Sequence, residues 1–241
     1  MTAPVDDLRA AIQRSRAILA LTGAGISAES GIPTFRGPGG LWRSYSPEQL
    51  ATPDAFARDP LLVWTWYDWR RGIIRGAEPN PGHRALAELE KLKGAGFTLV
   101  TQNVDGLHER AGSRRVVKLH GDIWKVRCTG CGASSVNDEV PLPELPPRCS
   151  CGALLRPGVV WFGESLPEDE WERAVEASRG AEVFLVAGTS AAVYPAAGLA
   201  ALARARGAKI AVVNPEDTPL DGLADWVLRG LAGEVLPRLA G

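Results

Sequence analysis

The sequence predicts an α/β protein with a doubly wound parallel sheet and a second, smaller lobe. Short apolar runs rich in β-branched residues alternate with segments of helical periodicity. Small and polar residues follow four of these runs, and all four cysteines fall in one segment that breaks the alternation. The 241 residues are enough for one sizeable core with a smaller insert.

The apolar runs are typical of buried parallel strands, because helices cover both faces of such strands. In chain order, four strands are predicted at residues 17–21, 98–101, 183–187 and 209–213, with weaker signals at 116–119 and 226–228. Helices are expected at residues 5–14, 82–93, 168–178 and 196–206. Strands that alternate with helices of this length favour a parallel sheet wound in both directions.

Glycines and polar residues gather where the four stronger strands end. They occupy residues 23–27, 102–106, 188–190 and 214–216. In open α/β sheets, ligands bind beyond the carboxyl ends of the strands. The sequence therefore predicts a ligand crevice at that edge of the sheet.

Composition and charge exclude several classes of protein. The 27 basic and 28 acidic residues give a net charge of -1, which argues against a dedicated nucleic-acid binder. Asp6 and Asp7 stand where a secretion signal would be basic and then apolar. Residues 183–203 carry no charge, but a strand, a polar turn and a helix near Pro195 explain them better than a membrane span does. A soluble, cytoplasmic protein is expected.

The four cysteines predict one structural zinc ion. They form two pairs, Cys128-x2-Cys131 and Cys149-x-Cys151, separated by 17 residues. Two such pairs present four thiolates to a tetrahedral ion and close its coordination shell. Two disulfides or four free thiols are the alternatives; a cytosolic chain disfavours the first, and clustering of every cysteine disfavours the second. The second pair is one residue shorter than usual, so its turn must be tighter.

The glycine-rich turn after the first strand favours a nucleotide ligand. Gly23 and Gly25 are followed by Gly31, which is only part of the dinucleotide fingerprint. Such glycines let the backbone approach a pyrophosphate, although many glycine-rich turns serve only to reverse the chain. A second small-residue turn, at 188–190, strengthens the nucleotide interpretation.

Several longer strings occur in a recognisable order. They are GAGISAESGIPTFRG at 23–37, TQNVDGLH at 101–108, LHGD at 119–122 and RPGVVWFGE at 156–164. With the cysteine pairs, these strings resemble the signatures of the sirtuins, which are NAD-dependent protein-lysine deacylases. The match runs in register from about residue 17 to residue 214. In sirtuins NAD is a consumed co-substrate and carries no hydride.

The resemblance implies a division into domains. A Rossmann-like NAD-binding domain is expected at residues 1–34, 82–122 and 160–241. A small domain would combine a helical insert, 35–81, with a zinc-binding insert, 123–159.

The resemblance also implies three catalytic residues, His120, Asn103 and Asp105. A neutral imidazole near pH 7 can take a proton from a ribose hydroxyl, and His120 stands where the family has its general base. For the other histidines, His83 and His108, a structural role is preferred. Asn103 and Asp105 would stabilise the cationic sugar that forms at C1′. The alternative, that they only cap a turn, explains one residue of the string but not all of it.

The NAD site implied by the resemblance extends over all four strand ends. Phe35 and Arg36 would belong to a loop that covers NAD. The expected NAD-binding residues are Gly23, Ala24, Gly25, Ile26, Ser27, Glu29, Phe35, Arg36, Trp42, Gln102, Asn103, Val104, Asp105, Gly188, Thr189, Ser190, Asn214, Glu216 and Ala232.

An aromatic stretch, WTWYDWRR at 64–71, bears on the substrate. Tyr67 and Arg70 are three residues apart and would share a helix face, where a guanidinium beside a phenol suits a carboxylate. A core-facing aromatic helix with solvated arginines is the alternative, and it is preferred for Trp64, Trp66 and Trp69. The Tyr-x-x-Arg pair resembles class III sirtuins, which accept succinyl-, malonyl- and glutaryl-lysine.

Other substrate contacts follow from the same resemblance. Ala51, a small residue, would leave room for a longer acyl chain. Val159, Val160, Trp161, Phe162 and Gly163 are expected to form an extended edge that pairs with the substrate peptide.

The sequence thus predicts a deacylase that removes succinyl or malonyl groups, and acetyl more weakly, from lysine. It would release nicotinamide and O-acyl-ADP-ribose and act as a monomer on acylated proteins, without nucleic-acid or membrane partners. One rival is a mono-ADP-ribosyltransferase or NAD glycohydrolase, which would need no acylated lysine. Another is a non-catalytic zinc-ribbon interaction module, which would not bind NAD.

Overall fold

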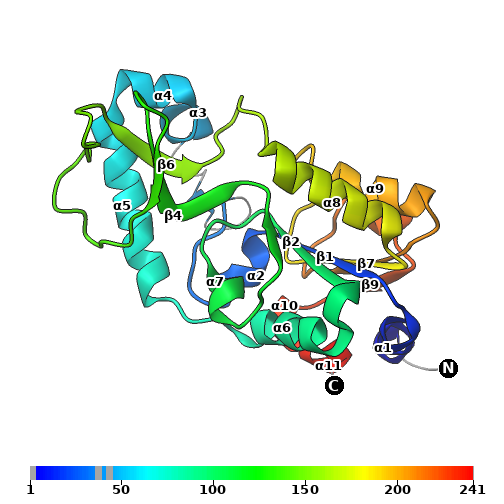
Figure 1. The fold of residues 1–241 in the computed structure, drawn as a ribbon. Helices are drawn as coiled ribbons and strands as arrows, with labels where there is room; N and C mark the ends of the chain where they lie inside the picture. The colour runs from blue at the N-terminus through cyan, green and yellow to red at the C-terminus, as the bar shows by residue number, and fades with distance from the viewer. Residues whose placement is uncertain (1–3, 36–39, 42–45, 241) are drawn as a thin grey trace.

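The computed structural model describes residues 4–35, 40–41 and 46–240. It contains a parallel sheet with helices on both faces and a lobe built on a second sheet (Figure 1), which confirms the predicted fold class. In spatial order the parallel strands are β3 (Val116–Lys118), β2 (Phe97–Thr101), β1 (Ile18–Thr22), β7 (Val183–Ala187), β8 (Lys209–Val213) and β9 (Trp226–Leu228). The second sheet is antiparallel, in the order β5 (Ser134–Val136), β4 (Gly121–Cys128) and β6 (Leu155–Val159).

The order of the parallel strands places a switch point between β1 and β7. From β1 the chain moves outward to β2 and β3, and it returns to β7 on the other side of β1 before moving to β8 and β9. Thr22, the last residue of β1, lies opposite Thr101 of β2 and Ala187 of β7. Because the connections diverge at this point, a crevice opens beyond these strand ends.

Two hydrophobic clusters cover the faces of the parallel sheet. Alternate residues of each strand belong to different clusters: Ile18 and Ala20 to one, Leu19 and Leu21 to the other. Figure 1 shows α8 and α9 on one side of the sheet and α1, α6, α10 and α11 on the other. The helices of this domain are α1 (Pro4–Arg14), α2 (Ala24–Ala28), α6 (Pro81–Lys93), α7 (Leu107–Arg110), α8 (Glu168–Gly180), α9 (Gly198–Ala205), α10 (Ala232–Val235) and α11 (Pro237–Ala240), with 3₁₀ turns at Gly94–Gly96 and Asp221–Leu223.

The smaller lobe packs around a third hydrophobic cluster, which also includes Ile32 and Leu107 of the parallel-sheet domain. Its helices are α3 (Pro47–Leu50), α4 (Pro53–Arg58) and α5 (Pro60–Gly76). Figure 1 shows α5 running beside β4 and β6, and Trp64, Val126 and Trp161 share one cluster across these elements. Two segments far apart in the sequence therefore form this lobe together.

One expectation for α5 was wrong. Trp64 and Trp66 are buried as expected, but Trp69 is 46% exposed. The buried face of α5 includes Tyr67, Arg70 and Arg71, and Trp69 lies outside it. The aromatic density of the stretch gave no indication of which tryptophan would face the solvent.

The glycine turns after β1 and β7 touch each other through their backbones. The Gly25 N–H donates to the Gly188 carbonyl oxygen at 2.8 Å. A Cβ atom on Gly25 would lie 2.7 Å from that oxygen, and one on Gly188, whose φ is +58°, would lie 2.3 Å from the Ile26 nitrogen. Only glycine fits either position, so these two turns meet closely at the switch point.

No helix in the described ranges is long and apolar enough to cross a membrane. The uncharged stretch at 183–203 folds into β7, a turn and most of α9, as the sequence predicts. Helix α9 begins at Gly198, two residues later than expected, because the backbone turns at residues 194–197.

Candidate active site

A cleft of about 570 Å³ opens beyond the carboxyl ends of β1, β2, β7 and β8 and continues to the smaller lobe. Its volume is ordinary for a ligand pocket. Of the predicted site residues, the cleft is lined by Gly23, Ala24, Gly25, Ser27, Phe35, Ala51, Tyr67, Arg70, Gln102, Asn103, Val104, Asp105, His120, Val159, Trp161, Phe162, Gly163, Gly188, Thr189, Ser190, Asn214, Glu216 and Ala232.

Among the described residues, two predicted NAD-binding residues, Ile26 and Glu29, do not line this cleft. Arg36 and Trp42 lie outside the described residues. Ile26 is fully buried in the hydrophobic cluster beneath the turn. Glu29 turns to α10, where one carboxylate oxygen accepts a hydrogen bond of 2.8 Å from the Gly233 N–H. Ile26 and Glu29 are therefore close to Gly25 in the sequence, but their side chains do not face the cleft.

His120 lies in the turn between β3 and β4. Its Nδ1 is 3.0 Å from the Gln102 carbonyl oxygen, which can only accept, so Nδ1 carries the hydrogen and Nε2 is left able to accept a proton. Burial lowers the pKa of His120, against the opposing effect of that carbonyl. The side chain is therefore neutral near pH 7, as a general base requires.

Asn103 and Asp105 are fixed by hydrogen bonds to the turn after β1. Asn103 Nδ2 donates to the Gly23 carbonyl oxygen at 3.0 Å and to Ser27 Oγ at 3.2 Å. Asp105 accepts from Ser27 Oγ at 2.8 Å and from the Leu107 N–H at 2.9 Å. Burial raises the pKa of Asp105, while these donors favour its charged form. The turns after β1 and β2 thus form one rigid polar floor.

The two remaining histidines are buried beneath this floor. His83 Nδ1 accepts from the Asn80 N–H at 3.3 Å, and His108 Nε2 is 2.8 Å from Thr22 Oγ1. Their ring centroids are 4.9 Å apart. Burial lowers the pKa of His83 to about 4 and that of His108 well below its ordinary value. Both imidazoles are neutral packing groups near pH 7.

These buried histidines predict that the protein loses stability in mild acid. The pKa of His83 is 6.5 in the unfolded chain and about 4 in the folded one, so the unfolded chain binds more protons between these values. The contribution of His83 to the free energy of unfolding is therefore present above pH 6.5 and is lost as the pH falls towards 4. His83 alone should lower the free energy of unfolding by about 2 kcal/mol between pH 7 and pH 5.

Urea unfolding at pH 7, 6 and 5 measures this loss. His83→Gln removes the titrating group but keeps a polar side chain, so the variant should lose less stability over the same range. Equal losses in the two proteins would contradict the assignment to His83.

The end of the cleft at the smaller lobe presents a buried cation. Arg70 on α5 is only 6% exposed, and burial lowers the pKa of its guanidinium. Its guanidinium carbon lies 4.5 Å from the centre of the Phe35 ring and 4.9 Å from that of Trp66. Within the described residues, Arg70 makes no hydrogen bond or ion pair. Tyr67 and Ala51 line the cleft beside it.

The expected extended edge at residues 159–163 is shorter than predicted. Val159 ends β6, and the Val160 N–H donates to the His120 carbonyl oxygen at 2.9 Å. The Phe162 N–H donates to the Ala51 carbonyl oxygen at 2.9 Å, and Gly163 has a φ of +87°. The chain therefore turns after Val160 instead of continuing as a strand.

Sequence reasoning missed several residues that line the cleft. The only signal for one of them, Tyr194, was its place after the polar turn that ends β7. The missed residues are Ala28, Ile32, Pro33, Thr34, Trp66, Glu164, Leu166, Val193, Tyr194, Pro195, Pro215, Asp217 and Leu231.

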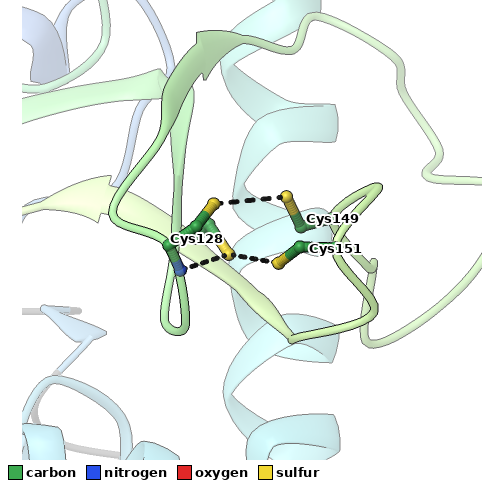
Figure 2. A group of neighbouring side chains, drawn as sticks. Cys128, Cys149 and Cys151 are labelled. Atoms are coloured by element: carbon green, nitrogen blue, oxygen red, sulfur yellow. Dashed lines mark hydrogen bonds between the residues drawn. The ribbon is translucent and has the colours of Figure 1, made fainter.

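The four cysteine thiols gather at one end of the smaller lobe. Figure 2 shows Cys149 and Cys151 directed from their loop towards the turn that carries Cys128. Sulfur–sulfur distances are 3.5 Å for Cys128 and Cys151 and 3.9 Å for Cys131 and Cys149, and all four atoms lie within 4.8 Å of one another. A tetrahedral zinc ion with Zn–S bonds near 2.3 Å requires about 3.8 Å between sulfurs. The cluster fits one structural zinc ion held by these four residues.

Backbone donors favour the thiolate form of Cys128. The N–H groups of Cys131 and Gly130 each lie 3.4 Å from Cys128 Sγ and lower the pKa of this thiol to about 6. The short second pair also reaches the site, because two backbone hydrogen bonds close a tight turn around it. The Gly152 N–H donates to the Cys149 carbonyl oxygen, and the Cys149 N–H donates to the Ala153 carbonyl oxygen.

Comparisons with known proteins agree on one family. The sequence model of the Sir2 family matches residues 23–195. The NAD-dependent protein deacylase of Aquifex aeolicus is 60% identical over 223 residues, 92% of this chain and 93% of that protein.

Solved structures of the family align over the whole fold. The crystal structure of a Sir2 homolog–NAD complex has a TM-score of 0.91 and 54% identity, covering 98% of this chain and 92% of that one. A Sir2 variant in complex with deacetylated p53 peptide and 3′-O-acetyl ADP ribose has a TM-score of 0.91 and 35% identity, covering 98% and 96%.

Proposed function

Because this chain belongs to the Sir2 family, we propose that its cleft binds NAD and an acylated lysine side chain and that the protein is an NAD-dependent protein-lysine deacylase. We further propose that it prefers succinyl and malonyl groups over acetyl. The relatives named protein deacylases and the neighbours solved with NAD and with O-acetyl ADP ribose support the reaction. The preference is supported by the residues of this chain alone.

The geometry assigns a task to each part of the cleft. The part of the cleft at the turns around Gly25 and Gly188 would hold the pyrophosphate of NAD, and Asn214 and Glu216 would contact the adenosine ribose. Asn103 and Asp105 would hold the nicotinamide ribose while the acyl oxygen attacks C1′ and nicotinamide leaves.

His120 would then complete the transfer of the acyl group. Its Nε2 would take the proton of a ribose hydroxyl. The hydroxyl oxygen would then attack the acyl carbon of the imidate that forms when the acyl oxygen bonds to C1′. Water then releases the free lysine and O-acyl-ADP-ribose. Zinc, held by the four cysteines, would act at a distance from the cleft as a structural ion.

The buried Arg70 carries the proposed preference. Arg70 is 6% exposed and makes no hydrogen bond or ion pair within the described residues, and the charge of Asp105 only partly offsets the cost of its burial, so a ligand that supplies a further counter-charge is favoured. A carboxylate at the end of a succinyl or malonyl chain supplies it, and the methyl of an acetyl group does not. Tyr67, one helical turn away, offers a second polar contact.

Substitution of Arg70 by methionine tests this preference. For the R70M variant, kcat/KM for a succinyl-lysine peptide should fall about 10- to 100-fold more than kcat/KM for the matched acetyl peptide, the range of a lost charge-assisted hydrogen bond. Arg75 lies on the same helix and is exposed, so R75M is the matched control and should keep the wild-type ratio. Equal losses of both activities in R70M would refute the anion pocket.

Product analysis distinguishes the proposed reaction from its rival. A deacylase releases nicotinamide only when an acylated peptide is present and yields O-acyl-ADP-ribose. Nicotinamide release without a peptide, or transfer of ADP-ribose to protein, would favour a glycohydrolase or an ADP-ribosyltransferase instead.

A further inference from the structure

Trp161 makes a hydrogen bond that determines what the Tyr67 hydroxyl can do. The indole Nε1 of Trp161 is 3.0 Å from Tyr67 Oη. Both side chains are buried, each 3% exposed, and both line the cleft. The bond joins the segment after β6 to the helix that carries Arg70.

The chemistry of the two groups fixes the direction of this bond. An indole N–H can only donate, so Tyr67 Oη is the acceptor and its own hydrogen must point elsewhere. No acceptor for that hydrogen lies within hydrogen-bond distance among the described residues. Burial raises the pKa of Tyr67 to about 12, so the hydroxyl keeps its proton at any pH where the protein works.

Trp161 is itself held in place on two sides. The Arg156 guanidinium lies 3.6 Å over the centre of its ring and forms a two-pronged ion pair with Glu164. The backbone N–H of Trp161 donates to the Glu164 carboxylate at 2.8 Å, and the Phe56 ring packs against the indole with 5.4 Å between ring centroids. The indole N–H is therefore a fixed donor whose position Arg156 and Glu164 set.

We propose that Trp161 is a specificity-determining residue that acts through Tyr67. By occupying the phenol oxygen as an acceptor, it directs the hydroxyl hydrogen into the cleft beside Arg70. The pocket then offers only donors, from a phenol and a guanidinium, to the end of an acyl chain. A carboxylate offers two acceptor oxygens and a negative charge to this pair; a terminal amide has one acceptor oxygen, no charge, and an NH2 group that faces only donors. This inference rests on the proposed preference for dicarboxylic acyl groups.

Selectivity measurements on Trp161→Phe test the inference. The phenyl ring keeps an aromatic surface under Arg156 but removes the N–H. Because the ring lines the cleft, turnover of every substrate should fall. The ratio of kcat/KM for succinyl-lysine to that for acetyl-lysine should fall a further threefold to tenfold, about the range of one hydrogen bond. Discrimination between succinyl-lysine and its terminal amide should fall by a similar factor.

A double-mutant cycle separates an effect through Tyr67 from a general one. Tyr67→Phe removes the hydroxyl, so W161F should change neither ratio further in the Y67F background. Trp64→Phe is the matched control: the indole N–H of the buried Trp64 also donates a hydrogen bond, to the Leu155 carbonyl oxygen at 2.7 Å, but Trp64 does not line the cleft. W64F should keep the wild-type ratios even if its melting temperature falls.

The outcomes separate this inference from the function on which it rests. Ratios that stay at the wild-type value in W161F but fall in Y67F would overturn the role of Trp161 alone. Independent, additive effects of W161F and Y67F would overturn it as well. A wild-type protein without a succinyl preference, or unchanged ratios in both Y67F and R70M, would refute the dicarboxylic preference and the inference with it.

Discussion

Replacing His120 with alanine should lower kcat for deacylation by about 10²- to 10⁴-fold, the range that a general base contributes. The Gln102 carbonyl oxygen accepts a hydrogen bond from Nδ1 of His120, so the hydrogen of the neutral ring is on Nδ1 and Nε2 is the ring nitrogen that can accept a proton. Removing the imidazole leaves the ribose hydroxyl without a group to take its proton. Steady-state turnover of an acylated peptide measures this loss.

Binding of NAD is the control for His120→Ala. The glycine turns after β1 and β7 do not depend on the imidazole, so calorimetry should show NAD binding within a few-fold of the wild type. Turnover within tenfold of the wild-type value would remove His120 as the base. Loss of NAD binding together with turnover would indicate a binding role instead.

Removing the zinc ion should unfold the smaller lobe and abolish activity. Structural zinc sites of this kind contribute an apparent binding free energy of about 10–16 kcal/mol, which equals or exceeds the stability of a typical domain. Strand β4 leads directly from His120 to Cys128. The same strand donates from the Ile123 N–H to the Val104 carbonyl oxygen at 3.0 Å and from the Trp124 indole to the Asp105 carbonyl oxygen at 2.9 Å.

Cys131→Ser tests the zinc prediction without a chelator. Its metal content should fall well below one ion per chain, its thermal transition should move to lower temperature, and its activity should fall more than about tenfold. Ser150→Ala alters the same site between two ligands without removing one, so it should retain metal and activity. Full activity in metal-free C131S protein would show that the cluster is dispensable.

Much of the fold could be predicted from the sequence because its strands are buried on both faces. Residues 183–187 and 210–213 are continuous apolar runs whose side chains are all buried, and Leu99 and Val100 at the centre of β2 are buried as well. These apolar runs predicted the buried strands, and their alternation with helices predicted that the strands are parallel. The polar strand ends then predicted the cleft, where most of the expected site residues do meet.

The remaining features depend on contacts that no local pattern contains. Trp69 faces the solvent because the packing of α5 on β4 and β6 selects the other side of the helix. Glu29 turns away from the cleft because α10 offers it a backbone donor at Gly233, 204 positions further along the chain. The hydrogen bond from Trp161 to Tyr67 likewise joins residues 94 positions apart.

The third hydrophobic cluster, around which the smaller lobe packs, has a consequence for how such an enzyme can diversify. Tyr67 and Trp161 belong to this cluster, whereas the strands that lead to the glycine turns pack in the two clusters of the parallel sheet. Mutations around Tyr67 and Trp161 therefore leave the packing of these strands intact, although Ile32 and Leu107 of the parallel-sheet domain share their cluster. Acyl choice can drift during evolution, or be redesigned by grafting, while the reaction chemistry is inherited unchanged.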